Sequence, residues 1–225
     1  SDLKKLIFVS TCSNYGLIKN NDLADENYPL APISLYAKSK VKAEKYIMNH
    51  KNRNINTSAT ILRFATAFGI SNRMRFDLTV NEFVKDLEQK KELIVYDADT
   101  WRPYCHAKDF ERLIKIIIES DTSKTSFEIF NVGSDKNNYT KRMIVKEISK
   151  FYKNPKIKYL EKGNDPRNYR VNFEKIKKVL NFVPNYSLSD GIVEIKEFMQ
   201  KSNFTLDKVN LSNYGNYIIK NYETN

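Results

Sequence analysis

Short apolar runs alternate with longer amphipathic segments along this chain. Residues 6–9 form a branched and aromatic run that ends in small hydroxyl residues, which is typical of a buried parallel strand that opens into a loop. In residues 108–119 the apolar side chains fall at helical spacing, so this segment should be a helix that packs on a sheet. Its predicted apolar positions are Phe110, Leu113, Ile114, Ile117 and Ile118.

Other segments extend this pattern. Thr140 is a good N-cap for a helix over residues 140–152, and Pro184 lies just beyond a helix over 172–180. Further helices are predicted at residues 35–50 and 77–88, and further strands at residues 93–96 and 156–160. The mixture of helices and short buried strands indicates an α/β fold.

Tyr36 and Lys40 are the most informative pair of residues. They lie four residues apart in a predicted helix, so both side chains should project from the same face. A neighbouring ammonium favours the phenolate form of a tyrosine, which suits proton transfer to or from an alcohol. The same spacing also occurs in ordinary helix packing, so the residues before it decide the interpretation.

Those residues are the hydroxyl side chains Ser10, Thr11 and Ser13, which follow the first predicted strand. In open α/β sheets ligands bind at the carboxyl ends of strands, where such hydroxyls could bond a substrate oxygen. A strand-end hydroxyl, a loop and then Tyr-x-x-x-Lys resembles the short-chain dehydrogenase/reductase superfamily. The resemblance is to its extended branch of NAD-dependent nucleotide-sugar epimerases, dehydratases and dehydrogenases. Three later segments resemble that branch in the same order, namely residues 60–69, 101–109 and 130–133. The resemblance therefore spans about residues 6–195.

The resemblance implies a role for each residue of the pattern. Thr11 would align the sugar hydroxyl that is oxidised, Tyr36 would take its proton, and Lys40 would hold the nicotinamide ribose. The hydride would pass to the cofactor, NAD or NADP, since removal of a hydride from an alcohol carbon requires a base on its oxygen. Ser10, Tyr36 and Lys40 would therefore contact the cofactor.

The implied substrate is a nucleotide-diphosphate sugar. Arg102 and Arg167 lie at positions that contact its diphosphate in the family, and guanidinium forks suit that anion. A surface ion pair is the alternative interpretation for each arginine. The other substrate-binding candidates are Thr11, Cys12, Ser13 and Thr66.

The family also implies the architecture. We expect the C-terminal part of a doubly wound Rossmann-type parallel sheet with an interleaved small α/β substrate-binding lobe. Residues 1–70 and 107–133 would form the remainder of the dinucleotide-binding domain, and residues 71–106 and 134–225 would form the lobe. The first strand, over residues 6–9, should then leave one edge of the sheet open.

One motif of the family has no counterpart here. The family opens with a Gly-x-x-Gly-x-x-Gly turn that binds the cofactor pyrophosphate at a helix N-terminus. The six glycines of this chain, at positions 16, 69, 133, 163, 191 and 215, are too far apart for that turn. We therefore expect the chain to lack the N-terminal cofactor-binding part and to be inactive without it.

The residues after Thr11 narrow the chemistry. The 4,6-dehydratases of this branch typically carry Asp-Glu there, whereas this chain has Cys12 and Ser13, which cannot act as carboxylates. Epimerisation at C4 through a transient keto intermediate, in surface polysaccharide sugar biosynthesis, is favoured. A nucleotide-sugar dehydrogenase or ketoreductase that uses NAD or NADP is the alternative, and a non-catalytic binding fragment is another. Residues 71–81 depart from the commoner epimerase pattern, so the substrate sugar stays open.

Composition adds several exclusions. The net charge of +11 comes from lysines scattered along the chain without an arginine-aromatic stripe, so no nucleic-acid partner is expected. No apolar run approaches the roughly 18 residues of a membrane span, and Cys12 and Cys105 show no metal-ligand spacing. We expect a cytoplasmic homodimer with reduced thiols and no metal. The aromatic residues in 204–225 form no motif that we can interpret.

Overall fold

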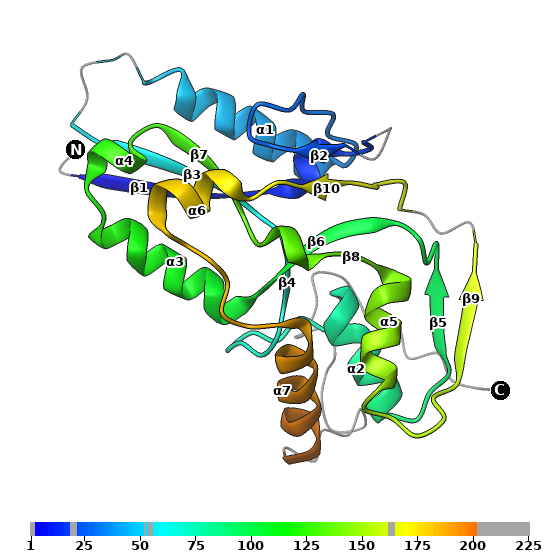
Figure 1. Cartoon of the computed structure of the whole chain (residues 1–225). Coiled ribbons are helices and arrows are strands. Elements are labelled where there is room, and N and C mark those ends of the chain that lie inside the picture. The colour runs from blue at the N-terminus through cyan, green and yellow to red at the C-terminus, as the bar shows by residue number, and fades with distance from the viewer. Residues whose placement is uncertain (1–2, 19–21, 52, 54–55, 162–164, 202–225) are drawn as a thin grey trace.

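The protein, which is described here by a computed structural model, contains a parallel sheet of three strands. The strand order is β1 (Lys5–Thr11), β3 (Ser58–Phe64) and β7 (Glu128–Val132). Helix α1 (Leu35–Met48) lies on one side of this sheet and α3 (Ala107–Glu119) on the other (Figure 1). This arrangement confirms the Rossmann-type α/β fold. The structure describes residues 3–18, 22–51, 53, 56–161 and 165–201.

Smaller sheets extend from this core. Strand β6 (Trp101–His106) runs parallel to β4 (Thr66–Phe68) and antiparallel to β8 (Asn138–Thr140). Two parallel pairs complete the described strands: β5 (Leu93–Tyr96) with β9 (Ile157–Leu160), and β2 (Leu23–Ala24) with β10 (Arg170–Val171). The remaining described helices are α2 (Thr79–Glu88), α4 (Thr122–Thr125), α5 (Lys141–Ser149), α6 (Glu174–Leu180), α7 (Leu188–Lys201) and the 3-10 turns η1 (Cys12–Tyr15) and η2 (Asp135–Asn137).

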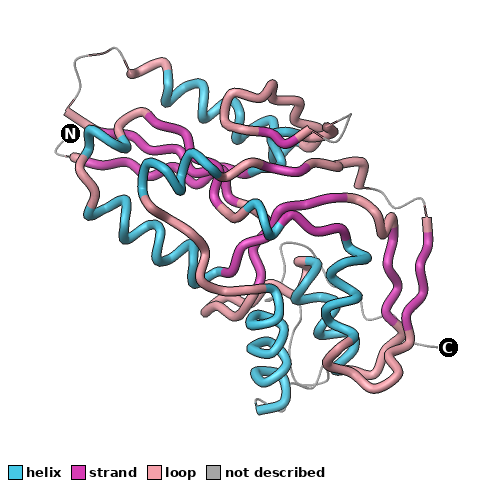
Figure 2. The backbone as a smooth tube through the Cα atoms, viewed as in Figure 1, coloured by secondary structure: helices cyan, strands magenta, loops and turns pink. Residues whose placement is uncertain are grey.

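Two hydrophobic clusters lie under these elements. One joins the three-stranded sheet to α3 and α6 through residues such as Leu62, Leu113 and Phe130. The other lies among α2, α5 and α7, which group beside β5 and β9 in Figure 2. The proposed division into a cofactor-binding domain and a substrate-binding lobe stays a prediction, and residues 204–225 lie outside the described part. None of the described helices combines the length and apolar character that a membrane crossing requires.

The predicted elements agree with the structure except at several ends. Thr140 caps α5, since its side chain accepts a hydrogen bond from the Met143 amide at 3.2 Å. Helix α6 begins at Glu174, two residues later than predicted, because the Asn172 side chain accepts from the Glu174 amide at 2.9 Å. The prediction of Ile118 as a core position was wrong, because it is 57% exposed at the edge of the apolar stripe of α3.

Helices α2, α5 and α7 also differ from the prediction. Helix α2 begins at Thr79 instead of 77, where the Asp77 carboxylate is bound by the Arg75 guanidinium. Helix α5 ends at Ser149, three residues before the predicted end. Helix α7 was not predicted, although it buries Leu188, Ile192 and Ile195 at helical spacing.

Strand β1 is the edge of its sheet in the described chain, because its one partner there is β3. Leu3, Leu6 and Val9 are exposed near this edge, and an open apolar edge favours association. We expect the 225-residue chain to self-associate and Leu6→Lys to reduce the association, as measured by light scattering. Val193→Lys, at an exposed position of helix α7, should have no effect. A wild-type chain that stays monomeric at its highest soluble concentration would contradict this prediction.

Candidate functional site

Helix α1 presents Tyr36 and Lys40 at its N-terminal end. The Ser34 hydroxyl accepts a hydrogen bond from the Ala37 amide at 3.1 Å, which starts the helix at Leu35 and places Tyr36 in the first turn. The Tyr36 side chain is 54% exposed. The Lys40 ammonium lies 5.7 Å from the centre of the Tyr36 ring, as the spacing of four residues on one helix requires.

Lys40 also joins this helix to the end of β1. Its ammonium donates a hydrogen bond to the Val9 carbonyl at 2.7 Å and lies 4.8 Å from the centre of the Phe8 ring. Val9 stands two residues before Thr11, the last residue of β1. The phenol, the ammonium and the strand end that carries the threonine therefore belong to one region of the fold.

The strand-end hydroxyls make local contacts. Thr11 Oγ1 accepts a hydrogen bond from the Ser13 amide at 3.1 Å and so caps η1. Ser10 is buried, and its hydroxyl donates to Glu44 at 2.5 Å. The Ser10 side chain is thus held in the protein interior, while its role at the cofactor stays a prediction.

Cys12 and Thr66 lie apart from these contacts. Cys12 is 1% exposed, its thiol donates to the Arg63 carbonyl at 3.1 Å, and burial raises the pKa of the thiol. Thr66 opens β4 opposite Tyr104 and is half-buried. Among the described residues, no hydrogen bond or ion pair joins Cys12 or Thr66 to the Tyr36 or Lys40 side chain.

Three predicted substrate-binding residues meet around one carboxylate. Arg167 Nη1 donates to Ser13 Oγ at 3.0 Å, and its Nε and Nη2 each donate to Asp165 at 2.7 Å. Arg102 Nη2 lies 3.1 Å from the same carboxylate, and its guanidinium is 5.0 Å from the centre of the Tyr169 ring. The Tyr169 hydroxyl lies 3.2 Å from Ser13 Oγ. The turn η1, strand β6 and the approach to β10 thus converge here.

This cluster carries excess positive charge. Arg102 is 6% exposed, so the surface ion pair that was the alternative interpretation does not describe it. Its Nη2 group is buried and makes no hydrogen bond to a described residue, although it is close to the Asp165 carboxylate. Burial alone would raise the pKa of Asp165, but the hydrogen bonds from Arg167 and the charge of Arg102 hold it well below its usual range. Two guanidiniums against one carboxylate can accept a further anion.

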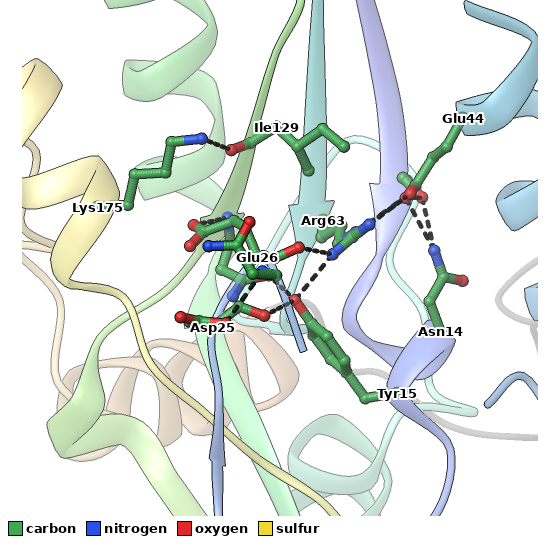
Figure 3. Close-up of polar contacts among 11 residues, drawn as sticks. Asn14, Tyr15, Asp25, Glu26, Glu44, Arg63, Ile129 and Lys175 are labelled. Carbon is green, nitrogen blue, oxygen red and sulfur yellow. Dashed lines mark hydrogen bonds and ion pairs between the residues drawn. The ribbon is translucent and has the colours of Figure 1, made fainter. Parts of the chain in front are cut away.

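Sequence reasoning missed Asp165, Tyr169 and the buried ion pair between Glu44 and Arg63, in which Nη2 lies 2.7 Å from Oε2 (Figure 3). The signals for the pair were present, because Glu44 lies one turn beyond Lys40 and Arg63 is the one charged residue of strand β3. Nothing in the sequence indicated that Asp165 would join two arginines that are distant from one another in the chain.

Comparison with known proteins decides the family. Residues 1–133 match the NAD dependent epimerase/dehydratase family. The chain belongs to this family. A Bacillus subtilis protein named as an uncharacterized UDP-glucose epimerase is 25% identical over 194 residues, which cover 84% of this chain and 58% of that protein. The predicted relationship to extended short-chain dehydrogenases/reductases is thereby confirmed.

Two solved structures are similar throughout the described fold. UDP-glucuronic acid 4-epimerase from Bacillus cereus, in complex with UDP-glucuronic acid and NAD, has a TM-score of 0.75 and 25% identity over 90% of this chain and 63% of its own. dTDP-glucose 4,6-dehydratase from Bacillus anthracis, in complex with NAD, has a TM-score of 0.76 and 25% identity over 88% of this chain and 62% of its own. This chain spans less than two thirds of the length of each relative, and NAD is the cofactor of the family.

Proposed function

We propose that this chain supplies the substrate-side catalytic part of an NAD-dependent nucleotide-sugar epimerase that acts at C4 through a transient keto intermediate. The observation that carries the proposal is the position of Lys40, which lies against the Tyr36 ring and bonds the end of β1. The match to a 4-epimerase supports the position on the sugar. The pathway of surface polysaccharide synthesis, the homodimer and the cytoplasmic location remain proposals.

The residues present fit one end of the cofactor. The ammonium of Lys40 is a donor and the exposed Tyr36 oxygen is an acceptor, and together they match the hydroxyls of a nicotinamide ribose. When bound, NAD supplies the acceptor for the hydride and returns it. The six glycines lie too far apart to build a pyrophosphate-binding turn, so we propose that these 225 residues are inactive alone.

The chain's own residues would move the proton. The Thr11 hydroxyl would orient the C4 hydroxyl of the sugar, and the Tyr36 phenolate would take the proton from that oxygen as it becomes a ketone. Lys40 would stabilise the phenolate by its charge and keep Tyr36 near the end of β1. After the keto sugar has rotated to present its opposite face, Tyr36 would return the proton to the oxygen. The buried Cys12 thiol takes no step.

Arg102 and Arg167 would anchor the substrate diphosphate. Arg102→Ala should raise KM for the nucleotide sugar about 10- to 150-fold, with kcat nearly unchanged, because a charge-assisted hydrogen bond contributes about 1.5–3 kcal/mol. The control is Arg142→Ala, which removes a surface ion pair with Asp99 and should leave KM unchanged. Steady-state kinetics of the complete polypeptide check this. A drop in kcat at constant KM would contradict the anchoring role.

Product analysis tests the proposed function. The complete polypeptide is incubated with NAD and a panel of UDP- and dTDP-sugars, with products identified by proton NMR and reduced cofactor followed by its absorbance. We expect a C4 epimer without net reduction of NAD. Stoichiometric reduced cofactor would favour the dehydrogenase alternative. Nucleotide-sugar binding without any conversion would favour a binding role.

A further inference from the structure

A buried ion pair lies beneath the predicted catalytic side chains. Glu44 follows Lys40 by one turn of α1, and Arg63 occupies β3, the middle strand of the sheet. Both side chains are 3% exposed, and Arg63 Nη2 and Nε contact the carboxylate at 2.7 and 3.1 Å. This bidentate contact, visible in Figure 3, joins the helix directly to the sheet.

Apart from Glu44, the buried side chains of α1 are small. The buried residues of the helix are Ala37, Val41 and Glu44. Alanine and valine bury little apolar surface, and their contacts have no strong directional preference. Hydrophobic packing alone would therefore tolerate a rotation or a shift of α1, whereas a guanidinium fork on a carboxylate permits one arrangement.

The carboxylate also binds the end of β1 and the turn that follows it. The Ser10 hydroxyl donates to Glu44 Oε1 at 2.5 Å, and the side-chain amide of Asn14 donates to the same oxygen at 2.8 Å. Ser10 immediately precedes Thr11, so the same carboxylate fixes the helix that carries Tyr36 and the strand end that carries its proposed partner.

The guanidinium reaches the opposite side of the network. Arg63 Nη1 donates to the Tyr15 hydroxyl at 3.0 Å and to the Glu26 carbonyl at 3.2 Å. The Tyr15 hydroxyl donates to Asn131 Oδ1 on β7 at 2.8 Å, and the backbone amide of Asn131 donates to Glu26 Oε1 at 2.7 Å. The segment that leads into α1 is thus held to the second and third strands of the sheet (Figure 3).

We propose that Glu44 and Arg63 are positioning residues that fix the rotation and depth of α1, so that Tyr36 and Lys40 face the strand end carrying Thr11. This inference rests on the proposed function of Tyr36 and Lys40. The pair touches neither substrate nor cofactor in this role. It acts through the helix, and variants that remove one charge or both separate its contribution from the cost of an unpaired buried charge.

Two variants of the complete polypeptide separate positioning from stability. Glu44→Gln leaves Arg63 buried beside a neutral amide and should lower both the unfolding temperature and kcat. Glu44→Leu combined with Arg63→Met removes both charges, so its unfolding temperature should lie above that of Glu44→Gln, although Ser10 and Asn14 lose the carboxylate to which they donate. Its kcat should nevertheless fall roughly 100-fold, the scale of a misplacement of about 1 Å, with KM little changed. Wild-type kcat in the folded double variant would overturn the proposal.

A second readout does not depend on turnover. Hydrogen exchange of the α1 amides in the double variant should be accelerated more than that of the β3 amides, whereas a uniform loss of stability would accelerate both alike. Asp99→Asn combined with Arg142→Gln, which removes a surface ion pair, should change neither exchange in α1 nor kcat. Wild-type exchange throughout α1 in the Glu44/Arg63 double variant would overturn the proposal. If the wild type turns over no nucleotide sugar while the exchange difference is found, the proposed function fails and the positioning of α1 stands.

Discussion

Tyr36→Phe is expected to lower turnover of the complete polypeptide by about 100- to 10,000-fold, the usual contribution of general acid–base catalysis. The substitution removes a single hydroxyl, which accepts the proton only as the alcohol is oxidised. Because this interaction belongs to the transition state, the loss should appear in kcat, and nucleotide-sugar affinity measured by calorimetry should stay close to that of the wild type. The exposed ring itself remains, so the start of α1 should be unchanged.

The same helix provides a matched control. Tyr46 is also exposed on α1, away from the end that carries Lys40, and Tyr46→Phe should leave turnover unchanged. Retention of more than about a tenth of wild-type turnover by Tyr36→Phe exceeds what loss of a general base allows. That result would remove the epimerase and dehydrogenase alternatives together and would leave a binding role as the better account.

Gly16→Ala should destabilise the fold by at least about 3 kcal/mol, because strain and a backbone clash add together. Gly16 has a φ of +67°, and a Cβ atom there would lie 2.0 Å from the carbonyl oxygen of Ala31. The clash cannot be relieved by a side-chain rotation, since the Ala31 amide also donates to the Asn14 carbonyl at 3.0 Å. The turn after β1 and the approach to α1 would have to separate.

Urea unfolding of the 225-residue chain measures this effect. Leu17→Ala, at the neighbouring exposed position, should change the free energy of unfolding by no more than about 0.5 kcal/mol. A Gly16→Ala variant whose free energy of unfolding lies within about 1 kcal/mol of the wild type would contradict this prediction. It would show that the turn can rearrange and that the close approach of the two segments is not required.

Local signals in the sequence predicted most elements. The apolar run at residues 6–9 became β1, and Thr140 capped α5 as its side-chain chemistry requires. Boundaries failed where the backbone made a contact that cannot be read locally, as at Asn172, whose backbone amide donates to the Ala24 carbonyl of β2 at 2.9 Å. Ile118 failed for a different reason, since helical spacing marks a stripe but not its edge.

The candidate site was predictable to a similar extent. The spacing of Tyr36 and Lys40 fixed their proximity, because one helix carries both. The meeting of Ser13, Arg102 and Arg167 depends on tertiary structure, since their shared neighbours Asp165 and Tyr169 come from a segment about 150 residues beyond the first strand. A single sequence without a known family pattern could not have joined them.

The fate of a deuterium at C4 of the nucleotide sugar tests the central claim most directly. An epimerase of the proposed kind removes the C4 hydride and returns the same one, so the complete polypeptide with NAD should give a C4 epimer that retains its deuterium. Neither deuterated reduced cofactor nor deuterium in the solvent should accumulate. Deuterium that collects in the reduced cofactor, or an epimer that has lost its label to water, would contradict the account.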